Sequence, residues 1–132
     1  MSEVLKLTIL TPDREFYEGE VIELITESTL GGITILPDHM PLITTLRPAD
    51  TVIVQKDNKK LKAFTSVGIL EVKENKLKIL CDACEWPEEI DIRRAEEARD
   101  RAKKRLTNRD GIDVQRAELA LARALARINL KQ

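Results

Sequence analysis

Residues 76–98, KLKILCDACEWPEEIDIRRAEEA, decide the fold, because the spacing of the apolar residues changes within them. Before Trp86-Pro87 the apolar residues alternate with lysine, and this period of two is typical of a strand with one buried face. After Pro87 they recur every three or four residues, which indicates an amphipathic helix. The sequence therefore predicts two unlike pieces, a β domain over residues 1–86 and an α-helical domain over residues 87–132.

The first piece is expected to form an antiparallel all-β sandwich or barrel, because many short strand-like runs are separated by turn signals. No helical pattern lies between these runs, which argues against a parallel βαβ sheet. The expected strands are Leu5–Ile9, Glu20–Glu27, Ile33–Leu36, Leu42–Leu46, Thr51–Gln55, Leu61–Thr65, Gly68–Val72 and Leu77–Cys81.

The second piece is expected to form an antiparallel helical hairpin. Its helices are predicted from about residue 90 to 106 and from about 113 to 130, with Asp110 or Asp113 capping the second. The expected apolar faces contain Ala95, Ala98, Ala102 and Leu106 on the first helix and Val114, Ala117, Leu121, Leu125 and Ile128 on the second. Eight alanines and no aromatic residue make this a weakly packed unit. We expect it to need the β domain, a partner or a ligand, and to be a moving part.

Composition excludes several classes of function. The 132 residues carry a net charge of −1 and only 3% aromatic residues, so a basic or stacking surface for nucleic acid is not expected. No apolar run is long enough to span a bilayer, no signal peptide is visible, and a cytoplasmic location is the default expectation. The CxxC at Cys81 and Cys84 has no second pair to complete a zinc site and is expected to be structural. His39 has no nucleophile motif nearby, so catalysis is not expected.

Arginines border the alanine seam of the expected hairpin. Three-and-four spacing places Arg94 and Arg101 on one stripe of the first helix, and Arg123 and Arg127 on one stripe of the second. If the helices pair along the alanines, these four guanidinium groups converge, and they match phosphate oxygens well. The alternative is a solvated charged face. Its acidic partners would be Glu96, Glu97, Asp100 and Glu118.

Two motifs resemble a known family. Residues 31–42, GGITILPDHMPL, are similar to the sheet signature GxxxxLPxHxPL of the epsilon subunit of bacterial F-type ATP synthase, and residues 113–125, DVQRAELALARAL, are similar to its final helix. The resemblance covers the whole chain and implies a β-sandwich followed by a helical hairpin. Met40 departs from the pattern, because the family often has a small residue there.

The resemblance implies a rotor subunit of the central stalk that has no active site. The implied partners are the gamma subunit, the ring of c subunits and, when the hairpin extends to restrain ATP hydrolysis, the alpha/beta hexamer. The implied location is the cytoplasmic face of the membrane, as a peripheral protein. The implied interface with gamma and the c ring comprises Gly32, Asp38, His39, Met40 and Pro41.

A subset of the family binds ATP as a regulatory ligand, with or without magnesium, through the motif I/L-D-x-x-R-A. Residues 90–95, IDIRRA, are similar to it at every fixed position. The residues that the resemblance assigns to ATP are Glu85, Ile90, Asp91, Arg94, Ala95, Arg101, Arg123 and Arg127. Two alternatives remain: a free-standing ATP-sensing module without a motor partner, and a small enzyme, for which the sequence offers no catalytic cluster.

Overall fold

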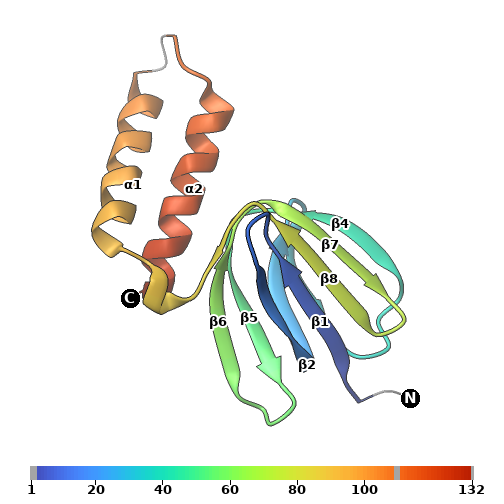
Figure 1. The fold of residues 1–132 in the computed structure, drawn as a ribbon. Helices are drawn as coiled ribbons and strands as arrows, with labels where there is room; N and C mark the ends of the chain where they lie inside the picture. The colour runs from blue at the N-terminus through green and yellow to red at the C-terminus, as the bar shows by residue number, and fades with distance from the viewer. Residues whose placement is uncertain (1–2, 109–110, 132) are drawn as a thin grey trace.

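The computed structural model describes residues 3–108 and 111–131, and it contains a β domain followed by two helices (Figure 1). The strands are β1 Leu5–Leu10, β2 Glu15–Ser28, β3 Gly31–Ile35, β4 Leu42–Leu46, β5 Ala49–Gln55, β6 Lys60–Thr65, β7 Gly68–Lys73, β8 Lys76–Cys81 and β9 Cys84–Glu85. The helices are the 3₁₀ turn η1 Pro87–Glu89, α1 Ile92–Thr107 and α2 Val114–Lys131. The predicted class, a β-sandwich followed by a helical hairpin, is confirmed.

The strands are hydrogen-bonded in the order β1-β8-β7-β4-β2-β5-β6-β9, and β3 pairs with β2. Because β1 also pairs with β2, the sheet folds back on itself into two layers (Figure 1). The pairing of β1 with β8 is parallel, with Leu7 beside Leu77, whereas the other pairings among the described strands are antiparallel. This parallel pair joins strands from the two ends of the domain. Such a pairing cannot be predicted from the local sequence pattern.

Strand β2 is the main departure from the predicted elements. It begins at Glu15 instead of Glu20, and it spans both layers, pairing with β1 along its first half and with β3 and β5 along its second. The first residues of β2, EFYEG, lack a regular apolar alternation, so their strand conformation depends on pairing with β1 and on burial of Phe16. The short strand β9 was likewise not predicted, because its two residues are ordered by pairing with β6.

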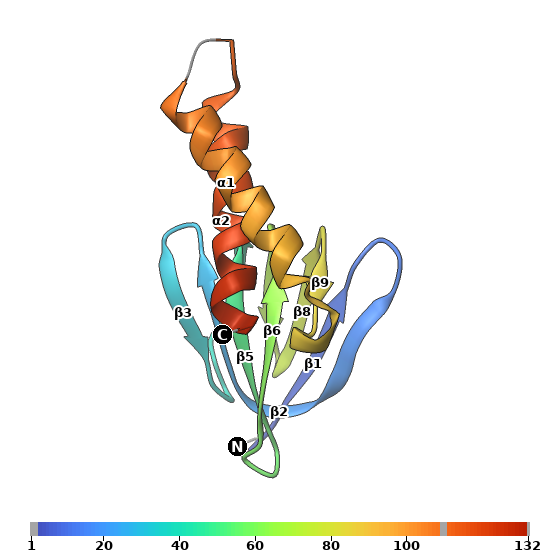
Figure 2. The ribbon, with the colours of Figure 1, turned by 90° about the vertical axis from the view of Figure 1, so that its left-hand side faces the viewer.

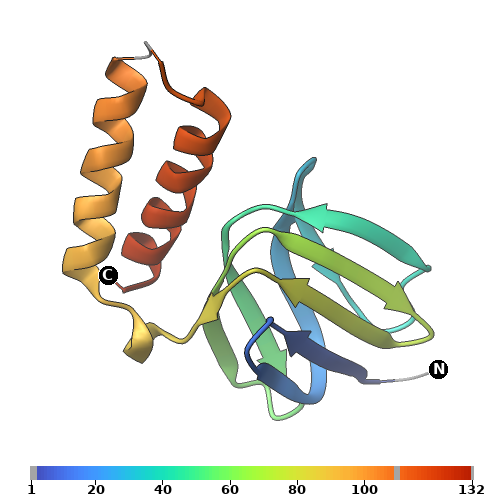
Figure 3. The same cartoon turned by 45° about the horizontal axis from the view of Figure 1, so that its top comes forward.

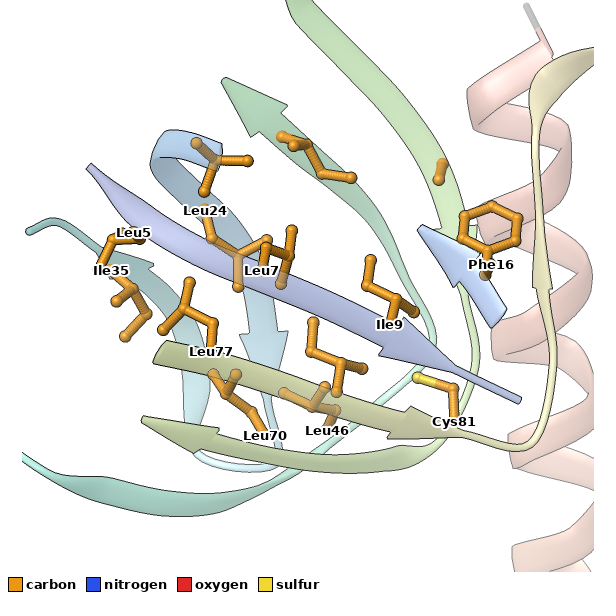
Figure 4. Close-up of a cluster of buried hydrophobic side chains, with 14 of the residues drawn as sticks. Leu5, Leu7, Ile9, Phe16, Leu24, Ile35, Leu46, Leu70, Leu77 and Cys81 are labelled. Carbon is orange, nitrogen blue, oxygen red and sulfur yellow. The ribbon is translucent and has the colours of Figure 1, made fainter. Parts of the chain in front are cut away.

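The core is aliphatic and lies between the two layers. Figure 4 shows side chains from β1, β2, β3 and β4 meeting those of β7 and β8. The alternation that predicted strands is the cause, because each strand sends every second side chain inward. The residues with no more than 1% exposure include Leu5, Leu7, Ile9, Val21, Leu24, Ile35, Leu46, Ile53, Phe64, Leu70, Leu77 and Ile79.

The two helices pair through small residues. Ala95 and Ala102 of α1 are buried, as are Ala117, Ala124 and Ile128 of α2. The predicted apolar face of the second helix was partly wrong: Leu125 is 44% exposed, and Ala124 occupies the seam instead. Alanines allow the helices to approach closely, so the contact line follows the small residues and not the large ones.

Local capping fixes both helix starts. The Asp91 carboxylate accepts from the Arg94 N–H at 3.2 Å, and the Asp113 carboxylate accepts from the Arg116 N–H at 3.1 Å. The second bond confirms one of the two predicted caps. The other candidate, Asp110, lies outside the described residues.

Among the described residues, the hairpin meets the sandwich at its base, where the end of α2 lies beside β5 and β6 (Figures 1 and 3). Asn129 donates to Asp50 of β5 at 2.6 Å, and Lys131 donates to the Pro87 carbonyl at 2.8 Å. Neither helix in the described part of the chain is long and apolar enough to cross a membrane.

Candidate functional site

A pocket at the base of the hairpin contains most of the residues that the family resemblance assigned to ATP. It has a volume of about 210 Å³ and lies where α1, α2, β9 and η1 meet, a region visible in Figure 2. We name it the arginine pocket. Its lining residues are Glu85, Glu89, Asp91, Arg94, Ala95, Ala98, Arg101 and Arg127.

Arg127 ties α2 to the sandwich. Its Nε donates to Glu85 Oε1 at 2.8 Å, and its guanidinium carbon lies 4.3 Å from the centre of the Phe64 ring. Both members of the ion pair are partly shielded, with side-chain exposures of 26% and 30%. The Nη2 of Arg127 also donates to Glu85 Oε2 at 3.4 Å, so Nη1 is the group best placed to donate to an anion.

The N-terminus of α1 forms another wall of the pocket. Asp91 caps this end, Arg94 lies in the first turn, and Arg101 follows two turns later. A helix N-terminus carries a partial positive charge and attracts phosphate groups. Ala95 and Ala98 line the same pocket, and their small side chains leave room for a ligand between the arginines.

Glu89 lines the pocket and was missed from sequence. Its carboxylate receives the Nη2 group of Arg14 at 2.9 Å on each oxygen, and Oε1 also accepts from the Trp86 N–H at 2.9 Å. The hydrogen bond from Arg14, followed by the one from Trp86, lowers the pKa of Glu89. Arg14 is 75 residues away in the chain, so no local signal could have found this pair.

The structure brings together six of the eight residues assigned to ATP. Arg123 is half-buried one turn before Arg127, and it does not line the arginine pocket. Ile90 is 5% exposed and also lies outside the lining. The alternative of a solvated charged face fits other residues. Arg93 pairs with Glu97 at 3.4 Å, and Arg99, which is half-buried, pairs with the exposed Asp100 at 3.0 Å.

The residues assigned to gamma and the c ring lie in the β3–β4 region of the sandwich, far along the chain from the pocket. Gly32, Asp38, Met40 and Pro41 are exposed, and His39 is half-buried with its Nδ1 2.7 Å from the Met40 carbonyl oxygen. Asp38 has a φ of 66° and is held by Asn75, whose Oδ1 accepts from the Asp38 N–H. The large exposed apolar side chains nearby are Leu30, Leu36, Met40 and Ile43.

A second hollow, a groove of about 560 Å³, separates α2 from the edge of β2 and β5. Asp50 lies in it, and one carboxylate oxygen accepts from Asn129 while the other is buried without a partner among the described residues. Burial, which removes water from the charged form, raises the pKa of Asp50, and the hydrogen bond from Asn129 only partly opposes this.

The CxxC cysteines are both free and both 5% exposed. A hydrogen bond with Cys81, followed by burial, raises the pKa of the Cys84 thiol, so this thiol stays protonated at neutral pH. The arrangement is that of core side chains. Within the described ranges no group of three metal-binding side chains comes together.

The fold and the pocket define a class: a β-sandwich that carries a two-helix hairpin, with an arginine-lined pocket between them. Residues 4–87 match the family described as ATP synthase, Delta/Epsilon chain, beta-sandwich domain, and residues 88–132 match its long alpha-helix domain. The chain belongs to the delta/epsilon family of ATP synthase subunits. It is therefore a structural and regulatory subunit and not a catalytic one.

Curated relatives agree with this family, and solved structures share the fold. The chain is 73% identical to the ATP synthase epsilon chain of Clostridium kluyveri over 130 residues, covering 98% of both chains. It is 49% identical to that of Clostridium botulinum strain Hall, covering 100% of this chain and 99% of the relative. A chain of the Euglena gracilis mitochondrial ATP synthase has the same fold, with a TM-score of 0.85 at 20% identity over 96% of this chain and 80% of that one. A chain from the Tetrahymena thermophila central stalk and c ring has a TM-score of 0.65 at 12% identity, over 97% and 96%.

Proposed function

We propose that this subunit couples rotation of the central stalk to ATP synthesis and restrains ATP hydrolysis with its hairpin, and that ATP in the arginine pocket holds the hairpin closed. The partners are the gamma subunit and the c ring at the sandwich, and the alpha/beta hexamer when the hairpin extends. The subunit then lies at the cytoplasmic face of the membrane as a peripheral protein. The family assignment supports the stalk role.

The proposed ATP site rests on one observation: the side chains that line the pocket come from both helices and from the sandwich. Arg94 and Arg101 come from α1, Arg127 comes from α2, and Glu85 comes from the last strand of the sandwich. A triphosphate held by these arginines would bridge both helices and the sandwich. It would bind the closed arrangement alone, because opening the hairpin separates the same groups.

The closed arrangement has few contacts to resist opening. Within the described ranges, the hydrogen bonds from α2 to the sandwich and its linker come from Arg127, Asn129 and Lys131, at the last two turns of the helix. A ligand at 100 times its dissociation constant adds about 2.7 kcal/mol to the state that it binds. Such a contribution is large enough to decide between a docked and an extended hairpin.

The extended state has the reach that inhibition requires. A continuous helix over the 41 residues from 90 to 130 would be about 60 Å long at the rise of an α-helix. The α-helical domain, residues 87–132, carries a net charge of +3, against −4 for residues 1–86. A cationic arm of this length is suited to an acidic surface on the hexamer.

Calorimetric titration of the purified subunit with ATP tests the nucleotide site. We expect binding with one ATP per chain, and a loss of about tenfold or more in affinity for Arg94→Ala and for Arg127→Ala, because each removes a hydrogen-bond donor to phosphate. Arg93→Ala is the matched control, since Arg93 is the neighbouring arginine and its side chain is 88% exposed beside Glu97. Equal affinity in the wild-type chain and all three variants would show that ATP binds elsewhere.

A further inference from the structure

The charges on the wall of the arginine pocket cancel. Three acidic side chains, Glu85, Glu89 and Asp91, face three arginines. A pocket with no net charge gives a triphosphate little long-range attraction. The attraction between the pocket and a triphosphate therefore depends on which cation neutralises each acidic side chain.

Two of the three acidic side chains already interact with groups of the pocket itself. Glu85 is held by Arg127, and Asp91 caps the N-terminus of α1. Glu89 differs, because its cation comes from outside the pocket. Among the described residues its ion-pair partner is Arg14, at the turn between β1 and β2.

Arg14 is anchored firmly for a surface residue. Its carbonyl accepts from the Thr11 N–H at 3.0 Å, its Nη2 also reaches the Cys84 carbonyl at 3.3 Å, and its guanidinium lies 5.0 Å from the Phe16 ring centre. Phe16 in turn stacks on Trp86, with ring centres 4.3 Å apart. Arg14 therefore joins the turn between β1 and β2 to β9, through the Cys84 carbonyl, and to η1, through Glu89.

We propose that Arg14 is a positioning residue of the nucleotide site. By neutralising Glu89 it leaves the pocket with a net charge of +1, and it holds the Glu89 carboxylate on the sandwich side, away from incoming phosphates. This inference rests on the proposed binding of ATP. It adds to the site a residue from near the N-terminal end of the chain, in the sandwich domain and outside both helices.

Coulomb's law sets the expected effect. At roughly 10 Å in water an uncompensated carboxylate weakens the binding of each phosphate charge about twofold, before screening by salt. For the three to four charges of ATP, we expect Arg14→Gln to bind about fivefold more weakly in 10 mM salt. The difference should shrink to about two- to threefold in 0.1 M salt.

A double-mutant cycle separates charge from structure. The variants are Arg14→Gln, Glu89→Gln and the two combined, titrated calorimetrically with ATP at both salt concentrations. The amide introduced by Glu89→Gln keeps an oxygen that can accept from the Trp86 N–H, so the linker retains its cap. Lys56→Gln is the control, because it breaks a comparable exposed ion pair, to Glu20, away from the pocket.

The proposal requires that Arg14→Gln bind ATP more weakly, that the loss shrink with salt, and that the double variant recover wild-type affinity. Lys56→Gln should bind like the wild-type chain. A double variant as weak as Arg14→Gln alone would overturn the proposal, as would an Arg14→Gln chain with wild-type affinity. In either case the ATP site itself would stand. A wild-type chain that binds no ATP would overturn both this inference and the proposed ATP site.

Discussion

Replacing Arg127 with alanine should loosen the hairpin even without nucleotide. Arg127 is the side chain of α2 that contacts two parts of the sandwich at once, Glu85 of β9 and the ring of Phe64 in β6. Its removal breaks an ion pair and a cation–π contact and leaves Glu85 without this partner.

The magnitude follows from the burial of these groups. With side-chain exposures of 26% and 30%, the ion pair is shielded enough to contribute about 1 kcal/mol. A partly desolvated guanidinium over an aromatic ring contributes about 1 kcal/mol more. The sum of about 2 kcal/mol corresponds to a change of about 30-fold in the ratio of docked to undocked hairpin.

Hydrogen exchange of the isolated subunit reports this ratio, because the last turns of α2 fray and their amides lose protection once their contacts with the sandwich are lost. Without nucleotide, the backbone amides of residues 124–130 should exchange about 30-fold faster in Arg127→Ala than in the wild-type chain. Arg123→Ala is the matched control. Arg123 lies one turn earlier on α2 and makes no comparable contact within the described part of the chain, so its exchange should be unchanged.

Two results would refute this account of docking. One is equal acceleration by Arg123→Ala and Arg127→Ala, which would mean that loss of any arginine weakens the helix. The other is unchanged exchange in Arg127→Ala, which would mean that the Phe64 and Glu85 contacts do not hold the hairpin.

Three further predictions test other parts of the structure. Burial raises the pKa of Asp50 above its ordinary value in the docked state, so that state binds the proton more readily and docking should strengthen as the pH falls from neutral into the acidic range. Asp50→Asn should abolish the part of this pH dependence that Asp50 causes, as measured by hydrogen exchange across pH. Gly68→Ala should destabilise the sandwich by about 2–3 kcal/mol in urea unfolding, because the new Cβ would overlap the Leu80 carbonyl oxygen. Asp91→Ala should destabilise α1 by about 1 kcal/mol through loss of its cap, with a lower helical signal in circular dichroism, whereas Asp113→Ala should act on α2 instead.

Local features were predictable because they depend on residues close in the chain. Alternation, β-branched residues and turn signals placed eight strands, and helical spacing placed both helices to within two residues. The cap at Asp113 was predicted from a side chain beside its own helix start; the cap at Asp91 was not predicted, although it is equally local. The start of β2 was missed for the converse reason, since Glu15–Gly19 is a strand only through its pairing with β1.

The candidate site was likewise predictable in part, where local spacing sets the positions of its residues. Helical periodicity placed four arginines on stripes beside the alanine seam: Arg94, Arg101, Arg123 and Arg127. A stripe runs along the whole helix, whereas the pocket includes only part of it, so periodicity does not say which of these arginines line the pocket. The position of α2 over Phe64 and Glu85 determines that Arg127 lines the pocket and that Arg123 does not.

The amino-acid sequence by itself determined the kinds of elements, their order and the family, because periodicity, caps and motifs act over a few residues. Only the tertiary structure decided which charges meet: Arg14 with Glu89 across 75 residues, and Asp50 with Asn129 across 79. Such pairs depend on how a sheet closes and where a helix docks. The closure of the sheet and the docking of the helix depend on burial summed over the whole domain, so they cannot be predicted from any short stretch of the chain.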